Sequence, residues 1–242
     1  MLFRSIYHEN FRTIKPGIEL LPSSFSLPRH RHLRPYATVV LCGTFEESGY
    51  SGRIRATAGD VLIHPALDCH GNIMVSAGVK LIRLEWSDRS GSGGFYHLEE
   101  VDTLARTAEK SPQDAAIVLE HLLSQKSSPS PSQANDWPDL LASALAEDCS
   151  LEIGTWAEQN SLAAATVSRG FHATYGVAPA TYRAELRARS AWLGVTRRGG
   201  NLATIALDTG FSDQAHMTRW VHRITGATPA LWRRRSQSKS GL

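Results

Sequence analysis

The carboxyl-terminal part of the chain contains one short pattern twice, and this repeat constrains the fold more than any other feature. The segments SRGFHATYGVAPATYR and TRWVHRITGATPALWR begin at residues 168 and 218 and align at an offset of fifty positions. The alignment pairs Arg169 with Arg219, His172 with His222, Gly176 with Gly226, Pro179 with Pro229, and Arg183 with Arg233. A glycine readily ends a helix, and a proline is favoured in the first turn of the next one. The repeat therefore predicts two copies of one helical unit.

Each copy is predicted to be a helix, a turn of three to four residues, and a second helix that ends at the glycine. The expected helices of the region are 153–160, 164–175, a long one from Pro179 towards Thr196, 202–209, 212–225 and 229–234. In the second copy Ser212 is the expected N-cap, since its hydroxyl can accept a hydrogen bond from an early backbone N–H. The apolar spacing predicts an inward face made of Ile205, Ala206, Phe211, Met217 and Val221.

The second helix of each copy has the features of a helix that enters the major groove of DNA. Gln214 carries the donor and acceptor that pair with adenine, and Arg219 can donate to guanine or contact a phosphate. Any one of these polar residues could equally belong to a solvated helix face. Two such helices, joined by one long helix, suit successive major grooves about 34 Å apart, which favours the DNA interpretation. The candidate DNA contacts are Thr166, Ser168 and Arg169 in the first copy and Ser212, Asp213, Gln214, His216, Arg219 and Arg223 in the second.

The last hundred or so residues resemble the DNA-binding domain of the AraC/XylS transcription regulators. The segment IALDTGFSDQAHMTRWVHRITGATPALWRR matches the family's most specific signature almost without gaps. The first copy resembles the family less well, because Ala163, Ala164 and Ala165 stand where relatives usually have a capping Ser and larger polar groups. It also has Gly170 inside the helix, at a cost of about 1 kcal/mol relative to Ala. The second copy is therefore expected to carry more of the sequence specificity, and the first mainly to contact phosphates.

The first hundred residues have the texture of a β structure. Short apolar or β-branched runs such as YATVVLC, DVLIHP and VKLIRLEW alternate with Gly, Pro and Ser. Residues 99–125 then read as two helices broken near Ser111, with apolar spacing at Ile117, Leu119 and Leu122. Such a pair could pack on the β domain or on its copy in a dimer. The Ser- and Pro-rich segment KSSPSPSQAND is read as a linker.

These readings give an α+β chain of more than one domain. The amino-terminal part is expected to be a cupin-like β-barrel with trailing helices, and the carboxyl-terminal part an all-α domain with two helix-turn-helix units joined by a long helix. The predicted segments are a ligand-sensing barrel at 1–98, a helical dimerisation segment at 99–125, a linker at 126–136, the DNA-binding domain at 137–235 and a disordered tail at 236–242.

Composition agrees with a globular protein that binds an acidic partner. The hydrophobic fraction of 42% is ordinary, and no apolar run approaches the length of a membrane span. The net charge of +3 is uneven, since residues 1–136 hold 14 Lys and Arg against 15 Asp and Glu, whereas residues 137–242 hold 12 against 8. Excess positive charge favours nucleic acid. The scattered Cys42, Cys69 and Cys149 are expected to be reduced thiols, and the lack of a secretory h-region predicts a cytoplasmic protein.

Histidines gather in two segments of the amino-terminal half, PRHRHLRPY and GDVLIHPALDCHGN. Their pattern resembles a cupin barrel, the usual sensor fold of AraC/XylS regulators, in which the H-x-H pair and a later His can line the barrel mouth. The resemblance implies a small organic ligand. The candidate lining residues are His30, His32, Tyr36, His70 and Trp86, although a tryptophan in the position of Trp86 is more often part of a core.

A metal site is the alternative interpretation of the same histidines. Because side chains alternate along a strand, His30 and His32 lie on one face, and His70 would complete a three-His set. The carboxylate that metal-binding cupins usually supply shortly after the H-x-H is missing, and Tyr36 stands near its place. We therefore favour no metal and expect no cofactor.

The sequence as a whole predicts a DNA-binding transcription regulator, not an enzyme, controlled by a small-molecule effector. The expected partners are promoter DNA, RNA polymerase and a second copy of the chain in a homodimer, with no membrane. Family resemblance implies activation, although repression is equally compatible. The alternative is a metal-dependent cupin oxygenase or isomerase with an added DNA-binding module. A DNA alkylation-repair protein is a further alternative, disfavoured because the cysteines form no close motif.

Overall fold

The computed structural model describes residues 11–87, 93–124, 126, 136–198 and 200–238. The chain divides into two compact units, of which the first ends at Asp139 and the second begins at Leu140. Of the predicted linker, all but Lys126 and Asp136 lies outside the described residues, as do residues 239–242 of the predicted tail. The last helix reaches Gln237, so residues 236 and 237, which the sequence analysis assigned to a disordered tail, are helical.

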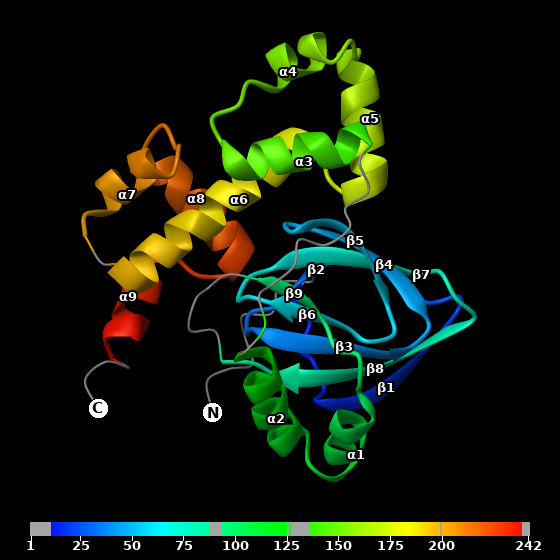
Figure 1. The fold of residues 1–242 in the computed structure, drawn as a ribbon. Helices are drawn as coiled ribbons and strands as arrows, with labels where there is room; N and C mark the ends of the chain where they lie inside the picture. The colour runs from blue at the N-terminus through cyan, green and yellow to red at the C-terminus, as the bar shows by residue number, and fades with distance from the viewer. Residues whose placement is uncertain (1–10, 88–92, 125, 127–135, 199, 239–242) are drawn as a thin grey trace. The chain divides into compact units, whose positions relative to one another are not determined.

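The amino-terminal unit contains two antiparallel sheets that face each other (Figure 1). The larger sheet has the order β1-β8-β3-β6-β9 and the smaller one the order β2-β7-β4-β5. The predicted β-rich half is therefore confirmed. The strands within the described residues are β1 Gly17–Pro22, β2 Ser26–Arg31, β3 Tyr36–Cys42, β4 Thr44–Gly49, β5 Gly52–Thr57, β6 Asp60–His64, β7 Cys69–Met74, β8 Gly78–Glu85 and β9 Gly94–His97.

The larger sheet is buried on both faces, which explains the continuous apolar runs of β3 and β6. On one face Ala37 and Val39 belong to a core cluster shared with helices. On the other face Val40 joins a second cluster that includes Phe45 and Met74 of the smaller sheet. Because successive side chains of a strand point to opposite faces of the sheet, alternate residues of β3 belong to two different cores.

The two predicted helices are present, α1 Asp102–Lys110 and α2 Pro112–Ser124, and they cover the outer face of the larger sheet, one of the two arrangements that the sequence left open. They pack against it through Leu104, Ala108, Ala115, Leu119 and Leu123 (Figure 1). The proposed apolar spacing is only partly right, because Ile117 is 67% and Leu122 38% exposed. In α2 the face that carries Leu119 points towards the sheet, together with the buried residues four positions before and after it, because residues four apart lie on the same face of a helix.

The carboxyl-terminal unit is all helical in its described residues, which confirms the predicted fold class. Its helices are α3 Trp137–Glu147, α4 Ile153–Gln159, α5 Ala164–Tyr175, α6 Pro179–Leu193, α7 Leu202–Asp208, α8 Gln214–Thr225 and α9 Pro229–Gln237, with a short π-helix, η1 Gly194–Arg198, after α6. Helix α6 runs between the pair α4–α5 and the pair α7–α8 (Figure 1). The predicted inward residues Ile205, Ala206, Phe211, Met217 and Val221 are all buried.

One arginine of α6 holds segments from both helix pairs. The Arg187 guanidinium donates to the Cys149 carbonyl oxygen, 2.9 Å from Nε, in the loop before α4. Its other side lies against Gly210 in the turn before α8, where a Cβ atom would come within 3.0 Å of Arg187 Nε. Gly210 also has φ +78°, so this position requires glycine on both counts.

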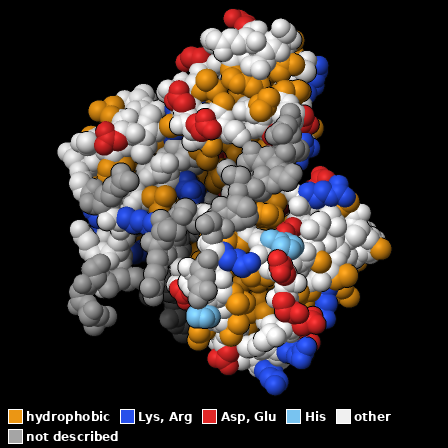
Figure 2. Space-filling model, in the orientation of Figure 1, with side chains coloured by type: hydrophobic (Ala, Val, Ile, Leu, Met, Phe, Trp, Pro, Cys, Tyr) orange, Lys and Arg blue, Asp and Glu red, His pale blue; other side chains and the backbone are white. Residues whose placement is uncertain are grey.

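The surface of the amino-terminal unit carries both signs of charge. On the face shown in Figure 2, Lys and Arg side chains are interspersed with Asp and Glu over this unit. Within the described residues, no helix combines the length and the apolar content that crossing a bilayer requires. The three cysteines, all of them described, form no disulfide in this structure.

Candidate functional site

The two predicted recognition helices, α5 and α8, end in the same way. Gly176 after α5 has φ 72° and ψ 2°, and Gly226 after α8 has φ 72° and ψ 4°. Each glycine donates its N–H to the carbonyl oxygen four residues earlier, of His172 and His222, at 2.8 Å in both cases. The predicted left-handed glycine stops are therefore confirmed.

The two recognition helices begin differently, and the N-cap predicted for α8 is wrong by one residue. Asp213 is the cap, since its Oδ1 accepts the His216 N–H at 2.7 Å. The Ser212 hydroxyl instead donates to Asp213 Oδ2 at 3.2 Å. The hydrogen bond from His216 also lowers the pKa of Asp213 below its usual value. The turn before α8 spans residues 209–213, one more than the turn 160–163 before α5, and this extra residue brings an acid to the cap position.

Most of the candidate DNA contacts on α8 share one exposed face. His216, Arg219 and Arg223 are spaced by three and four residues, which places them in one row along the helix, whereas Ser212 lies in the turn before it. His216 is half-buried, with its ring 5.2 Å from that of Phe211, and the Arg223 guanidinium lies 4.9 Å from the Trp220 ring centre. Gln214 is exposed in the first turn of α8 but lies about half a turn away from this row.

The first recognition helix presents fewer polar groups. Thr166, Ser168 and Arg169 are all exposed, and Thr166 and Arg169 share a face because they are three residues apart. Ala163 occupies the N-cap position and makes no side-chain hydrogen bond there. The first two residues of α5 are therefore exposed alanines, whereas α8 begins with the exposed Gln214.

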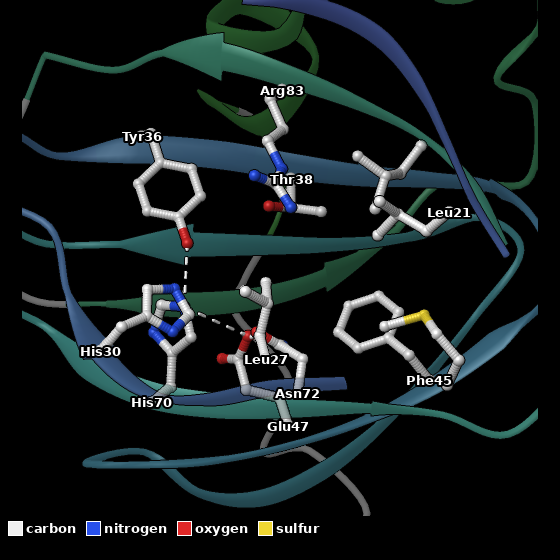
Figure 3. Close-up of a pocket in the computed structure, with 12 residues that line it drawn as sticks. Leu21, Leu27, His30, Tyr36, Thr38, Phe45, Glu47, His70, Asn72 and Arg83 are labelled. Carbon is white, nitrogen blue, oxygen red and sulfur yellow. Dashed lines mark hydrogen bonds and ion pairs between the residues drawn. The ribbon is translucent and has the colours of Figure 1, made fainter. Parts of the chain in front are cut away.

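Inside the amino-terminal unit, the structure brings the predicted histidines together. His30 on β2, His32 just after it, and His70 on β7 are all buried. The ring centres of His30 lie 4.9 Å from His32 and 4.7 Å from His70. The Tyr36 hydroxyl on β3 lies 3.0 Å from His70 Nε2, across the gap between the two sheets (Figure 3).

Hydrogen bonds fix how these imidazole rings point. His30 Nδ1 donates to the Pro28 carbonyl oxygen at 3.0 Å. His64 Nδ1 and His70 Nδ1 both lie 3.1 Å from Asp68 Oδ2, which accepts from them. The Nε2 atoms of His30 and His32 are left facing each other at 3.0 Å. In His30 and His70, Nδ1 is thus hydrogen-bonded to groups at the edge of the cluster, and Nε2 points towards the other members of the cluster.

Burial and charge separate the protonation states of the cluster. Burial, together with the neighbouring His70, lowers the pKa of His30 to about 3 and that of His32 to about 2, so both are neutral at pH 7. Burial also opposes a charge on His70, but Glu47 and Asp68 outweigh it and raise the pKa of His70. The hydrogen bonds from His64 and His70 likewise overcome burial and hold the pKa of Asp68 well below its usual range.

A small cavity lies beside this cluster, between the two sheets (Figure 3). Its volume is about 20 Å³, counted as space open to the centre of a water molecule. One end is polar and the other apolar. Of the predicted ligand contacts, His30, Tyr36 and His70 line it. His32 does not, and Trp86 packs instead against the core cluster that α1 and α2 share with the larger sheet. The lining residues are Leu21, Leu27, His30, Tyr36, Thr38, Phe45, Glu47, His70, Asn72, Met74, Leu81 and Arg83.

Sequence reasoning missed the polar lining residues Thr38, Glu47, Asn72 and Arg83. The signal for two of them was strand alternation. Glu47 follows Phe45 by two residues and Arg83 follows Leu81 by two, so each shares the inward face of its apolar neighbour. The Glu47 carboxylate is buried, accepts the Asn72 Nδ2–H at 2.8 Å, and lies 3.9 Å from His70 Nε2.

Comparison with known proteins assigns the carboxyl-terminal unit. A family model described as a helix-turn-helix domain matches residues 156–235, which span both copies of the repeat. No curated protein matches the chain significantly.

Several solved structures resemble the chain only distantly. ToxT from Vibrio cholerae with a bound unsaturated fatty acid is 10% identical, with a TM-score of 0.40 over 93% of this chain and 96% of that one. The carboxyl-terminal domain of AraT, a response regulator from Geobacillus stearothermophilus, is 16% identical, with a TM-score of 0.38 over 40% of this chain and 83% of that one. The corresponding domain of yesN from Fusobacterium nucleatum is 20% identical, with a TM-score of 0.36 over 39% of this chain and 94% of that one. Likeness at this level carries no inference about function.

Proposed function

Because residues 156–235 are a helix-turn-helix domain of the type found in AraC/XylS regulators, we propose that the chain is a sequence-specific transcription regulator whose DNA binding is controlled by a ligand in the amino-terminal barrel. One observation carries the DNA-binding part. Two helices that end at equivalent glycines, and that expose their polar residues, are joined by the single helix α6. That arrangement suits two major grooves on one side of the duplex.

The site residues divide by chemistry. Arg219 and Arg223, in one exposed row, suit phosphates and guanine, while Gln214 in the first turn suits adenine. Asp213 is already engaged as the helix cap, so we assign it to positioning the helix. On α5 only Thr166, Ser168 and Arg169 offer polar contacts near the start of the helix, which supports a phosphate-binding role for the first copy.

Ligand control is assigned to the barrel because its interior is polar at one end and apolar at the other. Polar side chains at one end could bind polar groups of a ligand and the other end its apolar part, and binding would shift an equilibrium between DNA-competent and incompetent states. The exposed Ile117 and Leu122 on α2 support dimerisation through that helix. A contact with RNA polymerase completes the proposal, and such a regulator works in the compartment that holds the DNA, the cytoplasm.

The test is fluorescence anisotropy of the protein on its own upstream DNA and on a shuffled duplex over a series of salt concentrations. Gln214→Ala is expected to lose about 1–3 kcal/mol of discrimination while keeping its salt slope, since it contacts a base and not a phosphate. Glu147→Gln, on the exposed surface of α3, is the control and should change nothing. Coincident curves on both duplexes at every salt concentration, with and without added ligand candidates, would contradict sequence-specific binding.

A further inference from the structure

We propose that the barrel binds a small organic acid, whose carboxylate lies against Arg83 and Thr38 and whose short apolar group enters the apolar end of the cavity. The proposal names the class of ligand for the barrel site, and the acid's role as effector rests on the proposed function. Arg83 on β8 and Thr38 on β3 pair with each other in the larger sheet. Both side chains line the cavity and point into the space between the two sheets (Figure 3).

Arg83 carries a positive charge that its surroundings do not satisfy. Its side chain is 18% exposed, and its Nε atom is buried without a hydrogen-bond partner. Glu19 Oε2 on the edge strand β1 lies 3.3 Å from this Nε, but outside hydrogen-bond geometry. A guanidinium has five N–H donors and stays charged in proteins. The side chain donates no hydrogen bond to any described residue, so its donors remain for an anion in the cavity.

The Thr38 hydroxyl is a second donor beside this guanidinium. Thr38 is only 4% exposed, and across the described part of the chain its hydroxyl has no hydrogen-bond partner. A buried hydroxyl without a partner costs free energy, which a ligand oxygen would offset. A carboxylate accepts several hydrogen bonds at its two oxygens, and its bonds to charged donors are the strong ones. The pair therefore matches one carboxylate.

The acidic side chains at the cavity and behind it already have partners. The Glu47 carboxylate accepts the Asn72 Nδ2–H at 2.8 Å and lies 3.9 Å from His70 Nε2. Asp68 Oδ2 accepts from His70 Nδ1 at 3.1 Å. The cavity thus lacks an acceptor for Arg83 and not a donor for Glu47, which favours an anion over an amine. A single negative charge balances Arg83, whereas a dianion would add repulsion from Glu47.

The rest of the ligand is apolar and short. Phe45, Met74 and Leu81 line the other end of the cavity and belong to the core cluster between the two sheets. The volume of about 20 Å³ holds a group the size of a water molecule. Pockets for drug-sized molecules are typically about 300–1,000 Å³. Because a methionine side chain is unbranched and adaptable, movement of Met74 can admit a few methylene groups but not a long chain.

The first experiment measures binding to the full-length protein by ligand-observed NMR at pH 7 and constant ionic strength. The probes are acetate, butyrate and octanoate, with butyramide as the uncharged equivalent of butyrate. We expect saturable binding of butyrate, weaker binding of acetate and octanoate, and no binding of butyramide. Inorganic phosphate is a further probe. Phosphate that binds as tightly as butyrate would overturn the assignment to an organic acid, and a lack of binding by all three acids would overturn the site.

Single substitutions then place the carboxylate. Arg83→Gln should weaken butyrate binding at least about 10-fold, because hydrogen bonds to a charged group are the strong ones. Thr38→Val keeps the shape of the side chain but removes the hydroxyl, and should weaken binding about 3- to 10-fold. Glu19→Gln removes the charge that competes for the guanidinium and should strengthen binding roughly two-fold or more. Arg55→Gln is the control, since Arg55 is 60% exposed on the outer face of β5.

Folding and function are read out separately. Butyrate should raise the Tm of the wild type but not that of Arg83→Gln. If Arg83→Gln does not fold, Thr38→Val and Glu19→Gln decide, because their expected effects have opposite signs. Unchanged butyrate affinity in all folded variants would overturn the placement at Arg83. Butyrate binding without a change in DNA affinity would overturn the acid's role as effector and leave the site in place. A lack of sequence-specific DNA binding with and without butyrate would contradict the proposed function instead.

Discussion

The two helix-turn-helix units have similar backbones that are stabilised by different side-chain interactions. In the second unit every helix begins with a side-chain cap, supplied by Asn201, Asp213 and Thr228. In the first unit α4, α5 and α6 begin without one. Since a cap satisfies a backbone N–H that the helix itself leaves unpaired, the first unit must obtain its stability elsewhere.

The first unit compensates with aromatic packing. Its rings Phe171, Tyr175 and Tyr182 lie with centres 4.7 to 5.4 Å apart. The positions fifty residues later hold Val221, Thr225 and Trp232, and there the Trp232 Nε1–H donates to Thr225 Oγ1 at 2.8 Å. Beyond the apolar core that both units have, the first is thus stabilised by packed rings and the second by caps and a part-buried hydrogen bond. In the proposed function the polar start of α8 serves a second purpose, because it would also face DNA.

The largest expected difference concerns the two cores. Tyr175→Ala should lower the free energy of unfolding by about 3–5 kcal/mol, since it opens a cavity between two other rings. Thr225→Ala at the equivalent position should cost about 1–3 kcal/mol, because it removes the acceptor of the part-buried Trp232 Nε1–H. Urea unfolding of the full chain, followed by tryptophan fluorescence, compares the two. Equal losses would show that the units do not differ in the way proposed.

The second difference concerns DNA. Changing single base pairs in the half-site that faces α8 should cost about 1–3 kcal/mol of binding free energy each, while changes in the half-site that faces α5 should cost much less. Anisotropy titrations on a set of singly changed operators measure both. Similar penalties at the two half-sites would contradict the idea that α5 mainly contacts phosphates.

The third difference concerns the caps. Asn201→Ala should cost about 1 kcal/mol, because the Asn201 side chain accepts the Ala203 N–H at the start of α7. Glu152→Asn, at the uncapped start of α4, should gain a similar amount. Chemical denaturation of the two variants beside the wild type tests the pair. If Glu152→Asn is neutral, the start of α4 has another partner for its N–H groups.

The smallest difference lies in the turns. Ser161 before α5 has φ 56° where Gly210 before α8 has φ 78°. A non-glycine residue in the left-handed region costs about 1–2 kcal/mol, offset by the entropy of the more flexible glycine, so Ser161→Gly should gain about 0.5 kcal/mol. The midpoint of urea unfolding should shift upward, and a downward shift would mean that the serine hydroxyl makes a compensating contact.

The sequence predicted a feature correctly where the residue type fits only one structural role, and failed where the residue type fits several. Glycine at a helix end has few alternatives, so both helix stops were placed correctly. Ser212 and Asp213 are equally good caps, and only the length of the turn selects Asp213. Glu47 was missed because an acidic residue in a strand usually faces solvent, and the fold alone shows that this one faces the histidines. The inward face of α2 was misread at Ile117 because short apolar stretches fit several helix phases.

Arg187 contacts both the loop before α4 and the turn before α8. These two contacts limit how the sequence of the protein can evolve. Adding one residue to α6 would rotate the helix pair on one side of Arg187 by about 100° relative to the other pair and break the Arg187 contact on that side. In the proposed function, exchanging a side chain on α8 would alter the preferred base and leave the arrangement of the helices unchanged. Binding preference can therefore drift one base pair at a time, while the distance between half-sites is inherited with the helix.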